Sequence, residues 1–159
     1  MKSIKVELKW AIIFTIMSVL WMALEKATGL HDVNIEKHYI YTNLYAIPAI
    51  LIYILALREK KFNFYNGHTN YKQLFISGLI LSLMIALLAP LSTYFSVEYL
   101  SPDYFDNAIN MSVKNKMMTQ IEAEEYFNTA NYMLQNLIAA PIMGIITTLV
   151  VSIFLRSKS

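Results

Sequence analysis

Residues 73–97 read QLFISGLILSLMIALLAPLSTYFSV, a run of 25 residues without Asp, Glu, Lys, Arg or His. About 20 apolar residues suffice for an α-helix to cross the hydrocarbon core of a bilayer. Similar uncharged runs occupy residues 10–24, 39–57 and 126–155. The chain is 57% hydrophobic and 15% charged, and a soluble domain of 159 residues could not bury so much apolar surface. We therefore expect an integral membrane protein with four transmembrane helices.

The predicted fold class is all-α: a polytopic membrane protein with four transmembrane helices in a bundle. We place the spans at about residues 8–29, 39–58, 72–96 and 128–155 of a single domain, residues 1–159, with an outer loop at about 97–127. The first uncharged run is short, and it reaches spanning length only if Glu25 and Lys26 lie near the interface. A cleaved signal peptide is the rival interpretation, but no small-x-small cleavage pattern follows the run.

The basic residues predict the orientation of the four spans. Nine of them fall on the side that holds both termini, and four fall on the other side. Short cytoplasmic loops are enriched in Lys and Arg, so both termini are expected in the cytoplasm. The nine are Lys2, Lys5, Lys9, Arg58, Lys60, Lys61, Lys72, Arg156 and Lys158.

The large outer loop contains two helix-start signals. Ser101-Pro102-Asp103 combines a cap residue, a first-turn proline and an acid at the positive end of a helix dipole. A short amphipathic helix is predicted after it. Thr119 and Glu122 form a capping-box pattern, which predicts a further helix that continues into the fourth span.

Small and polar residues recur along one face of each span. In lipid, such residues mark close helix contacts, although the same stripe could line a polar pathway. We favour packing and keep the pathway as the alternative. Pro48, Pro90 and Pro141 interrupt three spans, as static kinks or as hinges. The candidate packing or pathway residues are Asn43, Gly78, Ser82, Asn136, Ala140, Gly144 and Thr148.

No motif indicates a catalytic residue or a cofactor. The four glycines are too scattered for a phosphate loop or a dinucleotide fingerprint, and the absence of cysteine excludes thiolate chemistry. The middle of each span holds no ionisable residue, which argues against an ion-coupled transporter. The net charge of +2 hides a polarised distribution and is no signal for nucleic acid. The expected partners are the lipid bilayer and a protein partner or a second copy of the chain.

One polar cluster follows the first span. Imidazoles and carboxylates at this density could hold Zn²⁺. Their spacing fits no standard helical ligand pair, however, and their neighbours suggest a solvated loop, so we predict no metal site and keep the cluster as the one to test. Its members are Glu25, Lys26, His31, Asp32, Glu36 and His38.

Short segments along the whole chain resemble a bacterial family of small four-span membrane proteins, known only as a domain of unknown function. They are KSIKVELKWA at 2–11, WMxLEK at 21–26, GLHD at 29–32, YTNL at 41–44, IP at 47–48, FYNG at 64–67, YKQ at 71–73 and PDYF at 102–105. The resemblance implies four membrane helices in a bacterial cytoplasmic (inner) membrane. It implies no activity and no functional residues.

Three functional hypotheses remain open. The favoured one is a non-enzymatic membrane component that binds a partner or self-assembles. The second is a small-solute channel or carrier that uses the polar stripes. The third is an outer-interface enzyme that uses the cluster at residues 25–38.

Overall fold

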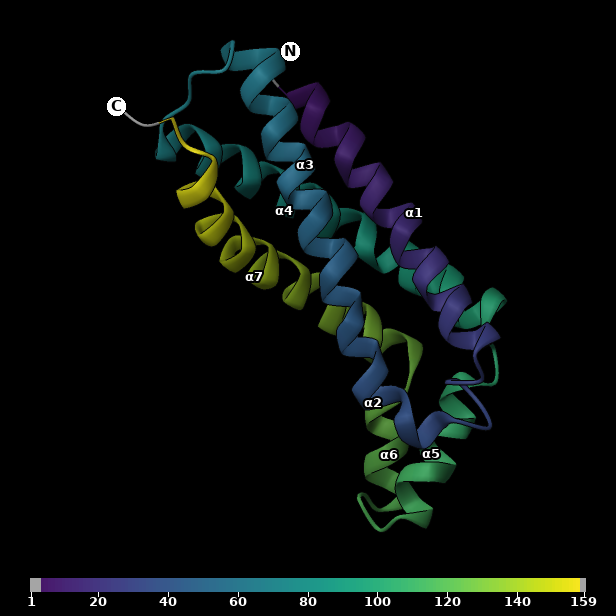
Figure 1. The fold of residues 1–159 in the computed structure, drawn as a ribbon. Helices are drawn as coiled ribbons and strands as arrows, with labels where there is room; N and C mark the ends of the chain where they lie inside the picture. Colours follow the sequence, from purple (N-terminus) through teal and green to yellow (C-terminus); the bar gives the residue numbers. More distant parts are fainter. Residues whose placement is uncertain (1–3, 158–159) are drawn as a thin grey trace.

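The computed structural model describes residues 4–157, and four of its helices are long and apolar enough to cross a membrane (Figure 1). They are α1 (Lys5–Ala27), α3 (Ala46–Tyr65), α4 (Tyr71–Phe95) and α7 (Thr129–Leu155). Within residues 4–157 there is no strand. The all-α fold and the four membrane helices are therefore confirmed.

Two of the spans extend beyond their main helix. A 3₁₀ turn (η2, Ile35–Lys37), α2 (His38–Tyr41) and a second 3₁₀ turn (η3, Thr42–Tyr45) lead directly into α3. At its far end α4 continues into a π-helical turn (η4, Ser96–Leu100). These extensions make spans of 31 and 30 residues, longer than the 20 and 25 predicted from hydropathy.

Local sequence explains the reversal between α3 and α4. Asn66 and Gly67 adopt φ values of 51° and 85°, the left-handed conformation that ends a helix. The side chain of Asn70 then accepts a hydrogen bond from the backbone N–H of Gln73, and the side-chain oxygen of Gln73 accepts one from the backbone N–H of Asn70. This capping box starts α4 in the opposite direction.

Figure 1 shows α1 beginning and α7 ending at the same end of the bundle, which we call the terminal end. The opposite end, the loop end, carries α2, α5 and α6. Helix α4 packs against both α1 and α7, and α3 contacts the same two helices. Lys2 and Lys158, two of the residues used to predict the orientation, lie outside the described residues.

Small residues bring α4 and α7 into close contact. A Cβ atom on Gly78 would lie 2.2 Å from Cγ2 of Thr148, and one on Gly144 would lie 2.3 Å from the Ser82 hydroxyl. Ser82 and Thr148 are fully buried. The two backbones can approach this closely because there is no side chain at either glycine.

The other stripe residues lie in different settings. Ala140 packs against the core cluster formed by Tyr53 and its neighbours. The Asn136 amide donates a hydrogen bond of 2.8 Å to the Thr93 hydroxyl. Asn43 is exposed, and its amide donates to the Tyr39 carbonyl at 2.7 Å, away from the α4–α7 contact.

The large loop folds into two helices, α5 (Tyr104–Lys114) and α6 (Gln120–Tyr126), and α5 is the predicted amphipathic helix. The capping box of Thr119 and Glu122 forms as predicted. The predicted continuation of α6 into the fourth span is wrong. Asn128 adopts an extended backbone, and its side chain caps the N–H of Asn131, so that α7 starts anew.

Candidate functional site

The candidate site begins with a sharp reversal after α1. Gly29 has a φ of 75°, and a Cβ atom there would lie 2.8 Å from Cγ2 of Val33. The N–H of Asn34 donates to the Gly29 carbonyl at 2.7 Å and closes the turn. Glycine is required here because other residues rarely adopt this conformation. The turn directs His31 back over the end of α1.

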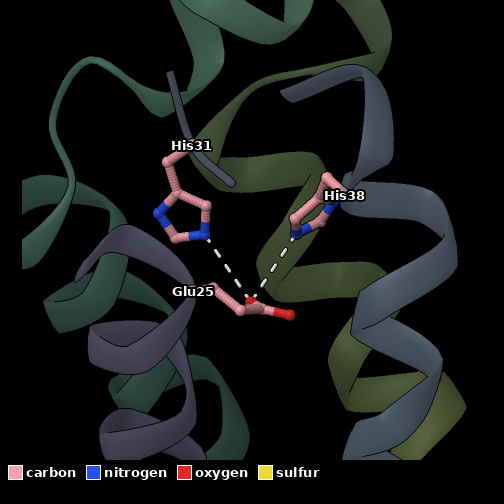
Figure 2. Close-up of side chains that lie close together, drawn as sticks. All are labelled: Glu25, His31 and His38. Carbon is pink, nitrogen blue, oxygen red and sulfur yellow. Dashed lines mark ion pairs between the residues drawn. The ribbon is translucent and has the colours of Figure 1, made fainter. Parts of the chain in front are cut away.

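Three side chains converge at this point, from three different segments (Figure 2). Glu25 lies on the last turns of α1, His31 on the loop, and His38 at the start of α2. The Nε2 atoms of His31 and His38 each lie 3.6 Å from Oε2 of Glu25. One donor atom from each residue falls within 4.8 Å of the other two. Glu25 and His31 are 4% and 2% exposed, so neither belongs to a solvated loop.

The spacing of these atoms suits metal ligands better than hydrogen bonds. A separation of 3.6 Å is too long for an N–H···O hydrogen bond, whose usual range ends near 3.2 Å. Two ligands at zinc distances in a tetrahedral site lie about 3.4 Å apart. Nε2 of His31 is buried and has no hydrogen-bond partner among the described residues. A bound cation would supply that partner.

A second layer of residues holds Glu25 and His31 in place. The Ser101 hydroxyl lies 2.8 Å from Nδ1 of His31, and Asn107 donates to the His31 carbonyl at 2.9 Å. The Trp21 indole N–H donates to Oε1 of Glu25 at 2.7 Å. Metal-binding histidines and carboxylates are ordinarily held by such outer hydrogen bonds. Sequence reasoning missed these three residues, because Ser101 and Asn107 lie 70 and 76 positions from His31.

Tyr104 closes the site from α5. Its ring centroid lies 4.7 Å from that of His31 and 5.4 Å from that of His38. Burial raises the pKa of the Tyr104 phenol well above its usual range, with a further contribution from Tyr132. The ring serves as an aromatic wall of the site.

The remaining members of the predicted polar cluster lie apart from these three. Lys26, Asp32 and Glu36 are all exposed. The Lys26 ammonium donates to the Leu100 carbonyl, and the Asp32 carboxylate accepts from the N–H of Val33. The predicted cluster of six thus divides into a converging group of three, with Glu25 and His31 buried and His38 partly buried, and an exposed group of three.

A separate ionic group is buried at the terminal end. The Lys60 ammonium lies 2.8 Å from Oε1 of Glu7, and the Ser77 hydroxyl donates to the same carboxylate at 2.6 Å. Glu7 and Lys60 are each 2% exposed. The sequence placed both residues among the loop charges, because nothing local distinguishes them from exposed ones. They join α1, α3 and α4.

Comparison with known proteins places the chain in a family whose function is unknown. The family model described as "Protein of unknown function (DUF4199)" matches residues 9–157. No curated protein and no solved structure matches the chain. The resemblance to a family of unknown function is confirmed, and it brings no functional residues with it.

Proposed function

We propose that this chain, which belongs to the DUF4199 family of proteins of unknown function, is a membrane protein that binds a divalent transition-metal ion. The ligands are Glu25, His31 and His38. The observation that carries the proposal is the convergence of their donor atoms within 4.8 Å, at a site where Glu25 and His31 are buried. Two imidazoles and one carboxylate suit Zn²⁺ and its first-row neighbours.

The electrostatics of the site support a cation. A carboxylate buried at the end of a membrane helix is costly unless a positive charge or several hydrogen bonds compensate it. Glu25 receives one close hydrogen bond, from Trp21 at 2.7 Å. A divalent ion between Glu25 and the two imidazoles would offset the buried negative charge and would give the His31 Nε2 atom a partner.

Three protein ligands leave one tetrahedral position for water or another molecule. Glu25 also lines a cavity of about 340 Å³, together with Trp21 and Lys37. The hypothesis of an outer-interface enzyme would use this open position. The metal site itself does not depend on that hypothesis.

We also propose that the loop end faces outward from a bacterial cytoplasmic membrane, with both termini in the cytoplasm. The support is the distribution of Lys and Arg, nine on the terminal side against four on the loop side. The ion would then be taken from outside the cell.

Metal binding also bears on the hypothesis of a partner-binding or self-assembling component. The site joins α1, the loop after it and α2, and Tyr104 of α5 packs against both imidazoles. A bound ion would stiffen these segments into one structured surface, which such a component needs. Native mass spectrometry of gently extracted protein measures the mass of the intact assembly, so it detects a bound metal ion and any protein partner in one experiment. A bare monomer would count against the partner hypothesis.

To test the metal proposal, the protein is purified through an affinity tag that contains no histidine. Bound metal is removed with a chelator, and the protein is then titrated with Zn²⁺ in mild detergent. The wild type is expected to bind one ion per chain. Loss of an outer hydrogen bond typically weakens metal binding by about 10–100-fold, so Ser101→Ala should fall in that range. His31→Ala and His38→Ala remove ligands and should lose more.

The third histidine supplies the matched control. His68 is exposed in the loop between α3 and α4, so His68→Ala should bind Zn²⁺ as the wild type does. The more conservative His38→Gln covers the case in which an alanine variant fails to fold, judged by its elution as a single species. Equal Zn²⁺ affinity in the wild type, His31→Ala and His38→Gln would end the proposal.

A further inference from the structure

The four spans line a partly open cavity of about 420 Å³. Its lining comes from residues 14–22 of α1, 42–53 of the second span, 85–97 of α4 and η4, and 132–147 of α7. These stretches run from about the middle of the bundle toward the loop end. In the other half, residues such as Leu57, Leu74 and Val151 form a closed core. The bundle is therefore solid at the terminal end and hollow toward the loop end.

A cavity of this size is unusual between closely packed helices. Interiors are ordinarily filled to crystal-like density, and an engineered cavity of about 150 Å³ already binds benzene. The cavity falls in the range of about 300–1,000 Å³ that is typical of small-molecule sites. Small side chains such as Ala49, Ala89 and Ala139 keep it open. Pro90 and Pro141 lie inside α4 and α7 within the same stretches, where each interrupts the helical hydrogen bonding, whereas Pro48 lies in the first turn of α3.

The chemistry of the lining indicates what the cavity would hold. Its residues include no Asp, Glu, Lys, Arg or His. Apolar and aromatic side chains dominate, and they are interrupted by hydroxyl groups and one amide, that of Asn136. Hydroxyls can both donate and accept hydrogen bonds, so they can meet a polar group of either kind. A charged ligand would find no countercharge, and charge is strongly disfavoured at membrane depth.

We propose that this cavity binds an uncharged amphiphile, a molecule with an apolar body and a hydroxyl or carbonyl group. The polar group would lie near Asn136, whose amide already donates to Thr93 at 2.8 Å and whose oxygen can accept a further bond. The apolar body would lie against Phe14 and Ala49. Such a molecule is available from the surrounding bilayer.

The cavity is chemically independent of the metal site, although Trp21 touches both. Trp21 lines the cavity and donates its indole N–H to Glu25. The chain has two tryptophans, so the Trp10→Phe background leaves Trp21 as the one reporter. A bromine atom within the cavity would quench its fluorescence.

The experiment compares three brominated probes that share one ten-carbon body: 10-bromodecanol, 10-bromodecanoate and 10-bromodecyltrimethylammonium. All three probes are compared at equal mole fraction in the micelles. The quenching of Trp21 fluorescence by the alcohol should reach saturation. The anion and the cation should bind on the order of 100-fold more weakly, the penalty expected for a charge at membrane depth. Equal saturable quenching by all three probes would overturn the proposal.

Cavity-filling variants locate the binding site. Ala49→Phe and Ala89→Phe place a ring in the cavity from two different helices and should weaken the saturable quenching by the alcohol at least tenfold. Ala130→Phe makes the same change at an exposed position on α7 that does not line the cavity, and it should leave the quenching unchanged. Linear quenching that is the same in all variants would show partition into the micelle only, and would refute the proposal. His38→Ala should retain alcohol binding, which separates this test from that of the metal site.

Discussion

The buried ion pair at the terminal end allows the sharpest test of the energetics of the fold. Lys60 and Glu7 lie 2.8 Å apart, each 2% exposed, and they join α3 to α1. At an effective dielectric constant near 20, two unit charges at this distance attract each other by about 6 kcal/mol. Desolvation of both groups offsets most of that attraction. The net contribution of the pair is therefore small, whereas the cost of breaking it is large.

The perturbation is a cycle of Glu7→Leu, Lys60→Met and the double variant. Each single change removes one member of the buried ion pair, and it should lower the free energy of unfolding by about 3–5 kcal/mol. The double variant replaces the pair with apolar side chains, and it should cost less than either single change. The assay is unfolding by SDS in mixed micelles, followed by tryptophan fluorescence.

The chain supplies a matched control in a second pair that also joins α1 to α3. The Lys9 ammonium contacts the Glu59 carboxylate, but the Lys9 and Glu59 side chains are 50% and 23% exposed. Lys9→Met should therefore cost no more than about 1 kcal/mol. The reasoning would be refuted if the loss of unfolding free energy in the double variant of the buried pair equalled the sum of the losses in the two single variants.

Two further predictions concern the packing of the bundle and the loop end. Gly78→Ala should lower the free energy of unfolding by about 1–3 kcal/mol, because the added Cβ atom meets Thr148 and the site is overpacked. Thr148→Gly should relieve that loss in the same SDS assay, and an unchanged stability of Gly78→Ala would show that α4 and α7 separate freely. Hydrogen bonds from the backbone N–H and then the hydroxyl of Thr119 lower the pKa of Glu122. The capping contribution is therefore full above the ordinary glutamate value of about 4.3 and is lost as the pH falls through the lowered value. Hydrogen exchange at the start of α6, corrected for the intrinsic rate, should accelerate in that acid range in the wild type but not in Glu122→Gln, and a similar acceleration in both would contradict this assignment.

Several features of the fold follow from local sequence. The four spans are readable from composition because every backbone N–H and C=O in lipid must be bonded within the helix, which demands about 20 uninterrupted apolar residues. The Asn66-Gly67 end of α3 and the capping box of α6 are equally local, since each depends on residues within one turn. The break at Asn128 was missed because an uncharged run continues through it.

The candidate site illustrates the limit of such reasoning. Glu25, His31 and His38 were all singled out from the sequence, but their spacing of six and seven residues matches no helical ligand pattern. They meet because Gly29 reverses the chain and because His38 starts the next span.

The outer partners of the site come from further away along the chain. Ser101 and Tyr104 lie about seventy residues beyond His31, and nothing near either residue marks its role.

Hydropathy and capping act over a few turns, so the membrane class of this protein, its four helices and most of their ends could be predicted from local sequence. Which charges are buried, as for Glu7 and Lys60, and where the bundle is hollow depend on the three-dimensional arrangement of the helices. Burial and cavity volume depend on how four helices approach one another. In lipid that approach is set by the contact of small residues such as Gly78 and Gly144, which the sequence marks as contact candidates without showing which helix each one meets.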